Sequence, residues 1–285
     1  MTGRKEMRKK MISKRNADRI LATYVAVVIL ATALFLAAPV LLTILMAFDS
    51  RDFLGPFPPP GLSLQWFQRL FDNDYLWSGF YTSLVVATAA TAISTVVGTL
   101  AALAISRMTR QWSDLLASIF LSPLVVPGVI MGFGMLMFFS AAGLLSPFPR
   151  LVAGHLMIAI PYTIRMTLIG LTGISGTLRE AALNLGANER QAFFTITLPL
   201  AKSSIAAGSI FAFAFSMDDL TISLFLGDFN TYTLPVALVG LMRSSFDLTI
   251  AAAAVALMGL TLILLFVLDR VFGLERAIGH GIDRT

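Results

Sequence analysis

Two adjacent carboxylates, Asp218 and Asp219, lie well inside an apolar run and are the strongest chemical signal in the sequence. Residues 213–223 read FAFSMDDLTIS, and apolar residues continue to 226. At the centre of a membrane helix each carboxylate costs about 2.5–3.5 kcal/mol on insertion scales, so such residues rarely face lipid and usually mark a pathway. The alternative is a helix that ends near Met217, which would leave both carboxylates at the membrane surface.

The two carboxylates would not share one face of a continuous helix. At about 100° per residue, Ser216, Asp219 and Ser223 fall on the same side, whereas Asp218 lies nearer to Thr221 and would face a neighbouring helix. We therefore expect Asp219, more than Asp218, to face a substrate pathway. Ser216, Thr221 and Ser223 are the expected polar residues beside it.

Other kinds of chemistry lack the residues that they need. The chain has no cysteine, so no disulfide, thiolate nucleophile or cysteine-ligated metal is possible. His155 and His280 are isolated from each other, which leaves no metal pair and no catalytic triad. The only lysine followed by Ser or Thr is Lys202, and Ala201 precedes it, so no phosphate-binding P-loop is present. We expect no catalytic residue, no metal site and no cofactor on this chain.

The composition is that of an integral membrane protein. Of 285 residues, 57% are hydrophobic and 13% charged, and the mean hydropathy is +0.82. The pattern predicts an all-α domain of six transmembrane helices over 20–269, between a basic segment at 1–19 and a tail at 270–285. The first run is too long for the apolar part of a signal peptide, so we expect it to be retained. The six apolar runs lie near 20–48, 81–105, 114–140, 150–172, 202–226 and 247–269.

The positive charges indicate an orientation rather than a nucleic-acid partner. The net charge is +5, but eight of the 21 Lys and Arg residues lie in the first nineteen positions, just before an apolar run. With the N-terminus inside, sixteen of them fall in cytoplasmic segments and four outside. Both termini and the loop at 173–201 are therefore expected in the cytoplasm.

The longest polar interruption after the first third of the chain, residues 175–200, predicts two helices and a turn between two spans. Good helix formers run to Leu185, and Gly186 suits the left-handed end of a helix. Asn188 is a good N-cap with Gln191 as its capping-box partner, and Pro199 marks the start of the next segment.

This loop resembles the cytoplasmic loop of permease subunits of binding-protein-dependent ABC importers. The family pattern is Glu-Ala-Ala, three residues, Gly, and a run that closes on Ile-x-Leu-Pro. The Ser-Met-Asp-Asp run at 216–219 is in turn similar to the spermidine and putrescine (polyamine) branch. An ordinary amphipathic connector is the alternative for the loop. The residues that match its pattern are Glu180, Ala181, Ala182, Gly186, Ile196, Leu198 and Pro199.

The resemblance implies a type I ABC importer permease (MetI-like) fold in the bacterial inner membrane, working by alternating access. It implies two separate ATPase subunits that carry ATP and Mg, with the loop docked into a cleft on one of them. It also implies a second permease subunit, expected to form a heterodimer with this chain but with an identical subunit as the alternative, and a periplasmic or lipid-anchored substrate-binding protein. The expected solute resembles putrescine or spermidine. The alternatives are another small solute such as an aminophosphonate, or an ion-driven secondary carrier that uses Asp218 and Asp219.

Each of two further segments has a functional and a purely structural interpretation. The third apolar run contains Pro123, Pro127 and Gly128, and such an interrupted helix either lines a transport site or is only kinked. The external segment at 49–80 is rich in proline and aromatic residues. It is either a loop with interfacial anchors or a docking surface for the soluble binding protein.

Overall fold

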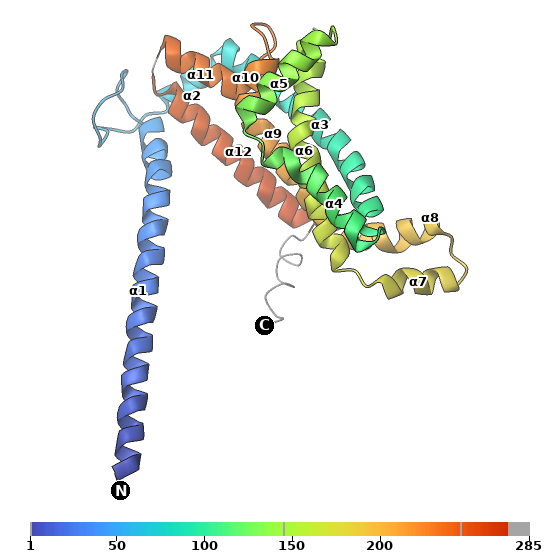
Figure 1. The fold of residues 1–285 in the computed structure, drawn as a ribbon. Helices are drawn as coiled ribbons and strands as arrows, with labels where there is room; N and C mark the ends of the chain where they lie inside the picture. The colour runs from blue at the N-terminus through green and yellow to red at the C-terminus, as the bar shows by residue number, and fades with distance from the viewer. Residues whose placement is uncertain (1, 145, 246, 273–285) are drawn as a thin grey trace. The chain divides into compact units, whose positions relative to one another are not determined.

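The computed structural model describes residues 2–144, 146–245 and 247–272, and helices make up nearly all of their regular structure (Figure 1). The chain divides into two compact units. One is Met1–Gln68 with Asp247–Val255, and the other is Arg69–Phe246 with Ala256–Thr285.

The first unit contains a long helix and a closed loop. Helix α1 (Thr2–Ala47) includes an apolar stretch of spanning length, Asp18–Ala47. The loop returns at an isolated antiparallel bridge between Asp49 and Leu62, and α2 (Gln65–Phe71) follows.

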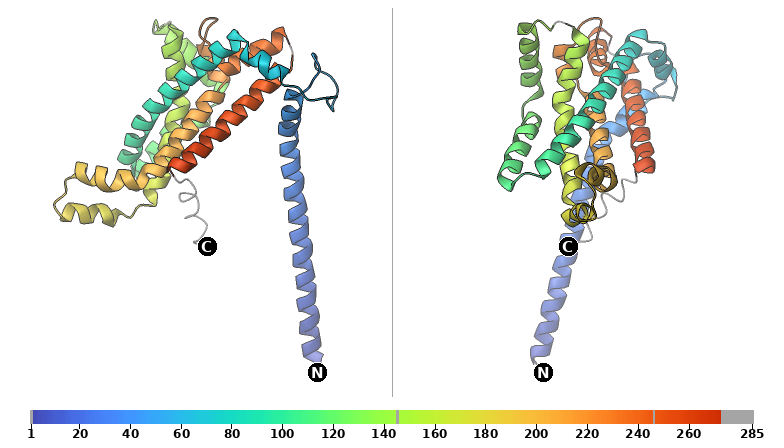
Figure 2. Two further views of the ribbon diagram at one scale, coloured as in Figure 1. Left: turned by 180° about the vertical axis from the view of Figure 1, so that it is seen from behind. Right: turned by 90° about the vertical axis from the view of Figure 1, so that its right-hand side faces the viewer.

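Three helices of the second unit pack along one another: α3 (Asp74–Ser106), α6 (Pro147–Thr172) and α9 (Leu198–Asp218) (Figure 2). Small residues allow this close approach. A Cβ atom on Gly98 of α3 would collide with Thr163 of α6. One on Gly208 of α9 would lie 3.1 Å from the Thr163 Cα. Thr163 is therefore enclosed between two glycines from neighbouring helices.

The third apolar run is interrupted, as its prolines and glycines indicate. Helix α4 (Arg110–Leu121) leads through a 3₁₀ turn at Ser122–Leu124 into α5 (Gly128–Ala141). The two halves are bent by 93°. Pro123 and Pro127 lie at the break and lack the N–H groups that would continue a helix.

The fifth apolar run is also interrupted, which corrects the expectation of one helix over 202–226. Helix α9 ends at Asp218, Asp219 has an extended backbone (φ −68°, ψ 115°), and α10 (Thr221–Leu226) follows. Helix α10 packs on α5, where the Phe133 and Phe225 ring centroids are 6.2 Å apart. The two short helices that follow the two interruptions are therefore neighbours.

Four helices of the described chain are long and apolar enough to cross a membrane, or five if α4 and α5 count as one span. Six spans remain a prediction, because α12 (Thr249–Phe272) contributes only a shorter apolar segment, Thr249–Ile263, to that count. Helix α11 (Leu234–Ser244) lies in a segment for which the sequence predicted no helix. The predicted tail at 270–285 lies outside the described residues from position 273 onward.

Candidate functional site

The predicted turn between two spans is formed by α7 (Gly176–Asn184) and α8 (Glu189–Ala192). Gly186 has φ +90°, the left-handed conformation expected of it. Asn188 Oδ1 accepts the Gln191 amide at 2.9 Å, and Gln191 Oε1 accepts the Asn188 amide at 2.8 Å. The capping box predicted from the sequence is confirmed.

One ion pair closes this loop and a second links it to the bundle. Arg179 of α7 pairs with Glu189 of α8, and Glu189 also lies 3.6 Å from Arg107, at the end of α3. Glu180 is exposed, and Leu185 beside the turn is 89% exposed. The loop therefore presents an acidic and an apolar side chain at the same end of the bundle as the α3–α4 connection (Figure 1).

The second helix of the loop is not a separate element, which corrects the sequence prediction. Helix α8 continues through a π-helical turn (Phe193–Thr197) into α9, and the stretch Glu189–Asp218 is one span of 30 residues. Pro199 lies in the first turn of α9. It has no N–H for the usual bond four residues back, and the wider turn before it accommodates that loss. Ile196 belongs to the wide turn, and Leu198 begins α9.

The two carboxylates have different surroundings. The Asp219 side chain is 11% exposed and accepts the Ser223 amide at 2.9 Å and the Ser223 hydroxyl at 3.2 Å. It therefore caps the start of α10. Asp218 is exposed on the surface of this chain. The premise of one continuous helix through both carboxylates is wrong, because α9 ends between them. The expectation that Asp219 faces a substrate pathway stays a prediction.

Ser216 and Ser223 are brought together by a residue that sequence reasoning missed. His155 of α6 is buried, with Nδ1 2.6 Å from the Ser216 Oγ and Nε2 3.0 Å from the Ser223 Oγ. Its Nε2 lies 3.9 Å from the Asp219 carboxylate. The partners follow 61 and 68 residues later in the chain, so no local pattern could reveal the cluster. Thr221 lies apart, next to Gly128 of α5.

Asp218 lies on the same face of α9 as two exposed aromatic residues. Phe211, Phe215 and Asp218 are spaced four and three residues apart, which aligns them along a helix. Tyr162 of α6 stacks on Phe215 at 4.2 Å between ring centroids and on Phe211 at 6.4 Å. An exposed carboxylate on the same face as aromatic rings is suited to attract a cation.

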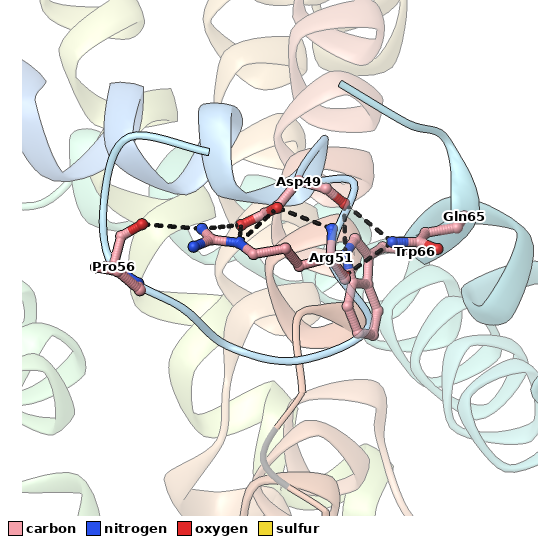
Figure 3. A network of polar contacts seen from close by, with 5 residues as sticks. All are labelled: Asp49, Arg51, Pro56, Gln65 and Trp66. Atoms are coloured by element: carbon pink, nitrogen blue, oxygen red, sulfur yellow. Dashed lines mark hydrogen bonds and ion pairs between the residues drawn. The ribbon is translucent and has the colours of Figure 1, made fainter. Parts of the chain in front are cut away.

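The loop that follows α1 in the first unit is closed by a network of polar contacts (Figure 3). The Arg51 Nε donates to Asp49 Oδ2 at 3.0 Å, and its terminal nitrogen donates to the Pro56 carbonyl at 2.9 Å. The Trp66 indole donates to the Asp49 carbonyl at 2.9 Å, and Gln65 donates to the Arg51 carbonyl at 2.8 Å. The hydrogen bonds from Arg51 hold the pKa of the Asp49 carboxyl below its usual range.

Among the described residues, no group of three or more His, Asp or Glu side chains is placed to hold a metal ion. The features that remain are those of a membrane transport protein: interrupted helices, a pair of carboxylates at the end of a helix of spanning length and a two-helix loop at one end of the bundle. This defines the chain as a multi-pass membrane permease.

The sequence places the permease in a family. Residues 94–273 match the family described as binding-protein-dependent transport system inner membrane component, and the chain belongs to this family. It is 30% identical over 240 residues to the putrescine transport system permease protein PotI of Escherichia coli (strain K12), covering 82% of this chain and 85% of that protein. It is 27% identical to the spermidine/putrescine transport system permease protein PotC of Haemophilus influenzae, covering 81% of this chain and 89% of that one.

Two further matches show how far the resemblance extends. The molybdate/tungstate transport system permease protein WtpB of Pyrococcus abyssi is 27% identical over 170 residues, which is 60% of this chain and 68% of that protein. A crystal structure of a bacterial alginate ABC transporter, in complex with an alginate pentasaccharide-bound periplasmic protein, contains a chain with a TM-score of 0.70 at 17% identity. That match covers 90% of this chain and 94% of the other, and it shows the shared fold.

Proposed function

We propose that the chain is a permease subunit that carries a small organic cation of the putrescine or spermidine class inward across the bacterial inner membrane. The exposed carboxylate of Asp218, beside the aromatic rings of Phe211, Phe215 and Tyr162, carries this proposal. Carboxylates attract ammonium groups, and aromatic faces add cation–π attraction of about 0.5–2 kcal/mol. The names of the PotI and PotC proteins support the same solute class.

We propose that two ATPase subunits, which bind ATP and Mg, supply the energy, and that α7 and α8 dock into one of them. Exposed Glu180 and Leu185 and the left-handed turn at Gly186 support a rigid docking element. Because α8 runs into α9 without a break, movement of the loop would be transmitted directly to the segment that ends at Asp218. This coupling would drive alternating access with both termini in the cytoplasm.

A second permease subunit would complete the pathway, and a periplasmic or lipid-anchored binding protein would deliver the solute. Asp218 is exposed on this chain although it ends a helix of spanning length, and lipid is a poor neighbour for a carboxylate. A second permease and a hydrated pathway would cover it. The external loop with its Asp49–Arg51 base would then lie on the side from which the binding protein arrives.

The competing solute is an anion, either an oxyanion, as the name of the WtpB protein indicates, or an aminophosphonate. An exposed carboxylate disfavours such a ligand. The ion-driven secondary carrier is set aside by the family, whose members depend on a binding protein.

The test is uptake by the complete complex in vesicles, with labelled putrescine and with molybdate as separate solutes. We expect ATP-dependent putrescine uptake that falls roughly tenfold or more in Asp218→Asn, since charge-assisted interactions amount to about 1.5–3 kcal/mol. The matched control is Asp114→Asn, an exposed aspartate on α4. Molybdate uptake without putrescine uptake, or full putrescine uptake by Asp218→Asn, would overturn the cation proposal.

A further inference from the structure

A buried histidine at the break between α9 and α10 has no part in the function proposed above. His155 is 0% exposed, and both of its ring nitrogens have hydrogen-bond partners on other elements. Ser216 is on the last turns of α9 and Ser223 is on α10. One imidazole ring thus joins α6 to the two segments on either side of the break.

The hydrogen bonds around this ring have a definite direction. The Ser223 hydroxyl donates its only proton to Asp219 Oδ2 at 3.2 Å, so its oxygen can only accept from His155. The His155 Nε2 must therefore carry a proton. In a neutral imidazole Nδ1 is then the acceptor, and the Ser216 hydroxyl donates to it at 2.6 Å. The donors run in one direction from Ser216 through His155 and Ser223 to the Asp219 carboxylate.

The consequence of this series of hydrogen bonds is the placement of α10. Ser223 gives both its amide and its hydroxyl to Asp219, so the bond from His155 also fixes the capped first turn of α10. That turn rests on α5, where a Cβ atom on Gly128 would lie 3.3 Å from the Thr221 Cβ. If α10 moved, the cap would open and Asp219 would be released.

We propose that His155 is a positioning residue for the carboxylate pair. Through Nε2 it holds α10 in place, which keeps Asp219 turned inward as a cap and leaves Asp218 as the carboxylate that meets the solute. The identity of the solute that meets Asp218 rests on the proposed function. The placement of α10 by His155 does not depend on it.

Three substitutions of His155 distinguish the hydrogen bond made by Nε2 from the one made by Nδ1. In His155→Gln the side-chain amide reaches the position of Nε2 and can still donate to Ser223. In His155→Asn the shorter amide occupies the position of Nδ1, where it meets Ser216 and leaves Ser223 without a donor. His155→Leu fills the space and removes both bonds. A residue that only fills the core would tolerate Leu and would show no preference for Gln over Asn.

The first measurement is solute moved per ATP hydrolysed, in the complete complex reconstituted with its binding protein and labelled putrescine. We expect His155→Gln to stay close to the parent protein. His155→Asn and His155→Leu should transport roughly tenfold less per assembled complex. ATP hydrolysis and the putrescine concentration at half-maximal uptake should change little, because the binding protein sets the latter. Equal losses in transport, hydrolysis and assembly for all three variants would overturn the proposal.

The second measurement does not depend on the solute. The chain has no cysteine, so Gly128→Cys with Thr221→Cys introduces one possible disulfide between α5 and α10. The Cβ separation of 3.3 Å is close to the roughly 3.5–4.5 Å that a disulfide spans. With copper phenanthroline added as the oxidant, we expect rapid cross-linking with His155 or His155→Gln and cross-linking slowed severalfold with His155→Asn. Equal rates for Gln and Asn would overturn the positioning role even if putrescine proves to be the wrong solute.

Discussion

At the scale of single residues, sequence neighbours take different roles according to where the helix stops. Asp219 lies at the N-terminus of α10 and accepts its amides, a position that favours a negative charge. Asp218 is still within α9 and shares an exposed face with Phe215. The backbone change at Asp219 therefore divides a pair of carboxylates into one structural and one accessible group.

We expect the stability of the loop that follows α1 to depend on pH through the buried Asp49–Arg51 pair. The pKa of Asp49 is lowered in the folded protein by hydrogen bonds from Arg51. Stability from this pair is therefore present above the unfolded pKa, about 3.9, and is lost as the pH falls through the lower folded value. We expect the Ser63 amide, which donates to the Phe48 carbonyl at 2.7 Å, to stay protected from hydrogen exchange at pH 5–8 and to lose protection on acidification below about pH 4.

Asp49→Asn should remove this dependence and weaken protection already at neutral pH, after correction for the intrinsic exchange rate. The matched control is Asp72→Asn, an exposed aspartate outside the network, which should behave as the parent protein does. Equal protection in Asp49→Asn and the parent protein at pH 7 would show that the pair does not hold the loop.

At the scale of elements, the turn between α7 and α8 depends on one backbone conformation. Gly186 has φ +90°, and a β-branched residue is strongly disfavoured there. We expect Gly186→Val to abolish most ATP-dependent uptake while the chain still inserts in the membrane, because the two helices can no longer present their exposed side chains together. Uptake and the amount of membrane-inserted protein are the measurements.

A second glycine in the same loop provides the control. Gly176 begins α7 with no positive φ, and an added Cβ would meet no atom within 4 Å. Gly176→Val should therefore retain most of the uptake. Equal loss in both variants would indicate general sensitivity of the loop to bulk rather than a need for the left-handed turn.

Local rules predicted the features of this loop that depend on near neighbours. Gly186, Asn188 and Gln191 lie within one six-residue stretch, so their types and spacing were sufficient. A helix end near Met217 was only the alternative reading, because the apolar pattern continues past Asp219. Helix α9 does end at Asp218, and its neighbours α5 and α6, which contact α10, show why the break exists. His155 was missed for the same reason, because its role depends on hydrogen bonds to residues from distant parts of the chain.

At the scale of the molecule, the second unit has the α7–α8 loop at one end, and Asp218 lies at the opposite end of the helical stretch that continues from this loop. Helix α9 connects the two, since it continues from α8 and ends at Asp218. Gly98 and Gly208 allow α3 and α9 to pack against α6 along this path, so a displacement of α9 would also move its neighbours. One continuous helical stretch therefore connects the loop to Asp218.

The last prediction concerns the partner at that loop. Glu180 is exposed and is not engaged by the Arg179–Glu189 ion pair that closes the loop, so its charge is available to another subunit. We expect Glu180→Lys to lower the amount of ATPase that co-purifies with the permease, or to leave ATP hydrolysis uncoupled from uptake. Replacing an attractive charge with a repulsive one at a protein interface costs several kcal/mol when the group is desolvated.

The matched control is Asp114→Lys, which makes the same change of charge at an exposed site on α4. It should leave assembly and coupling intact, so the comparison separates a specific contact from the effect of net charge. Glu180→Ala removes the attraction without adding repulsion and should show an intermediate loss. Unchanged co-purification and unchanged transport per ATP in Glu180→Lys would remove Glu180 from the ATPase contact and leave the turn at Gly186 as the only tested part of that surface.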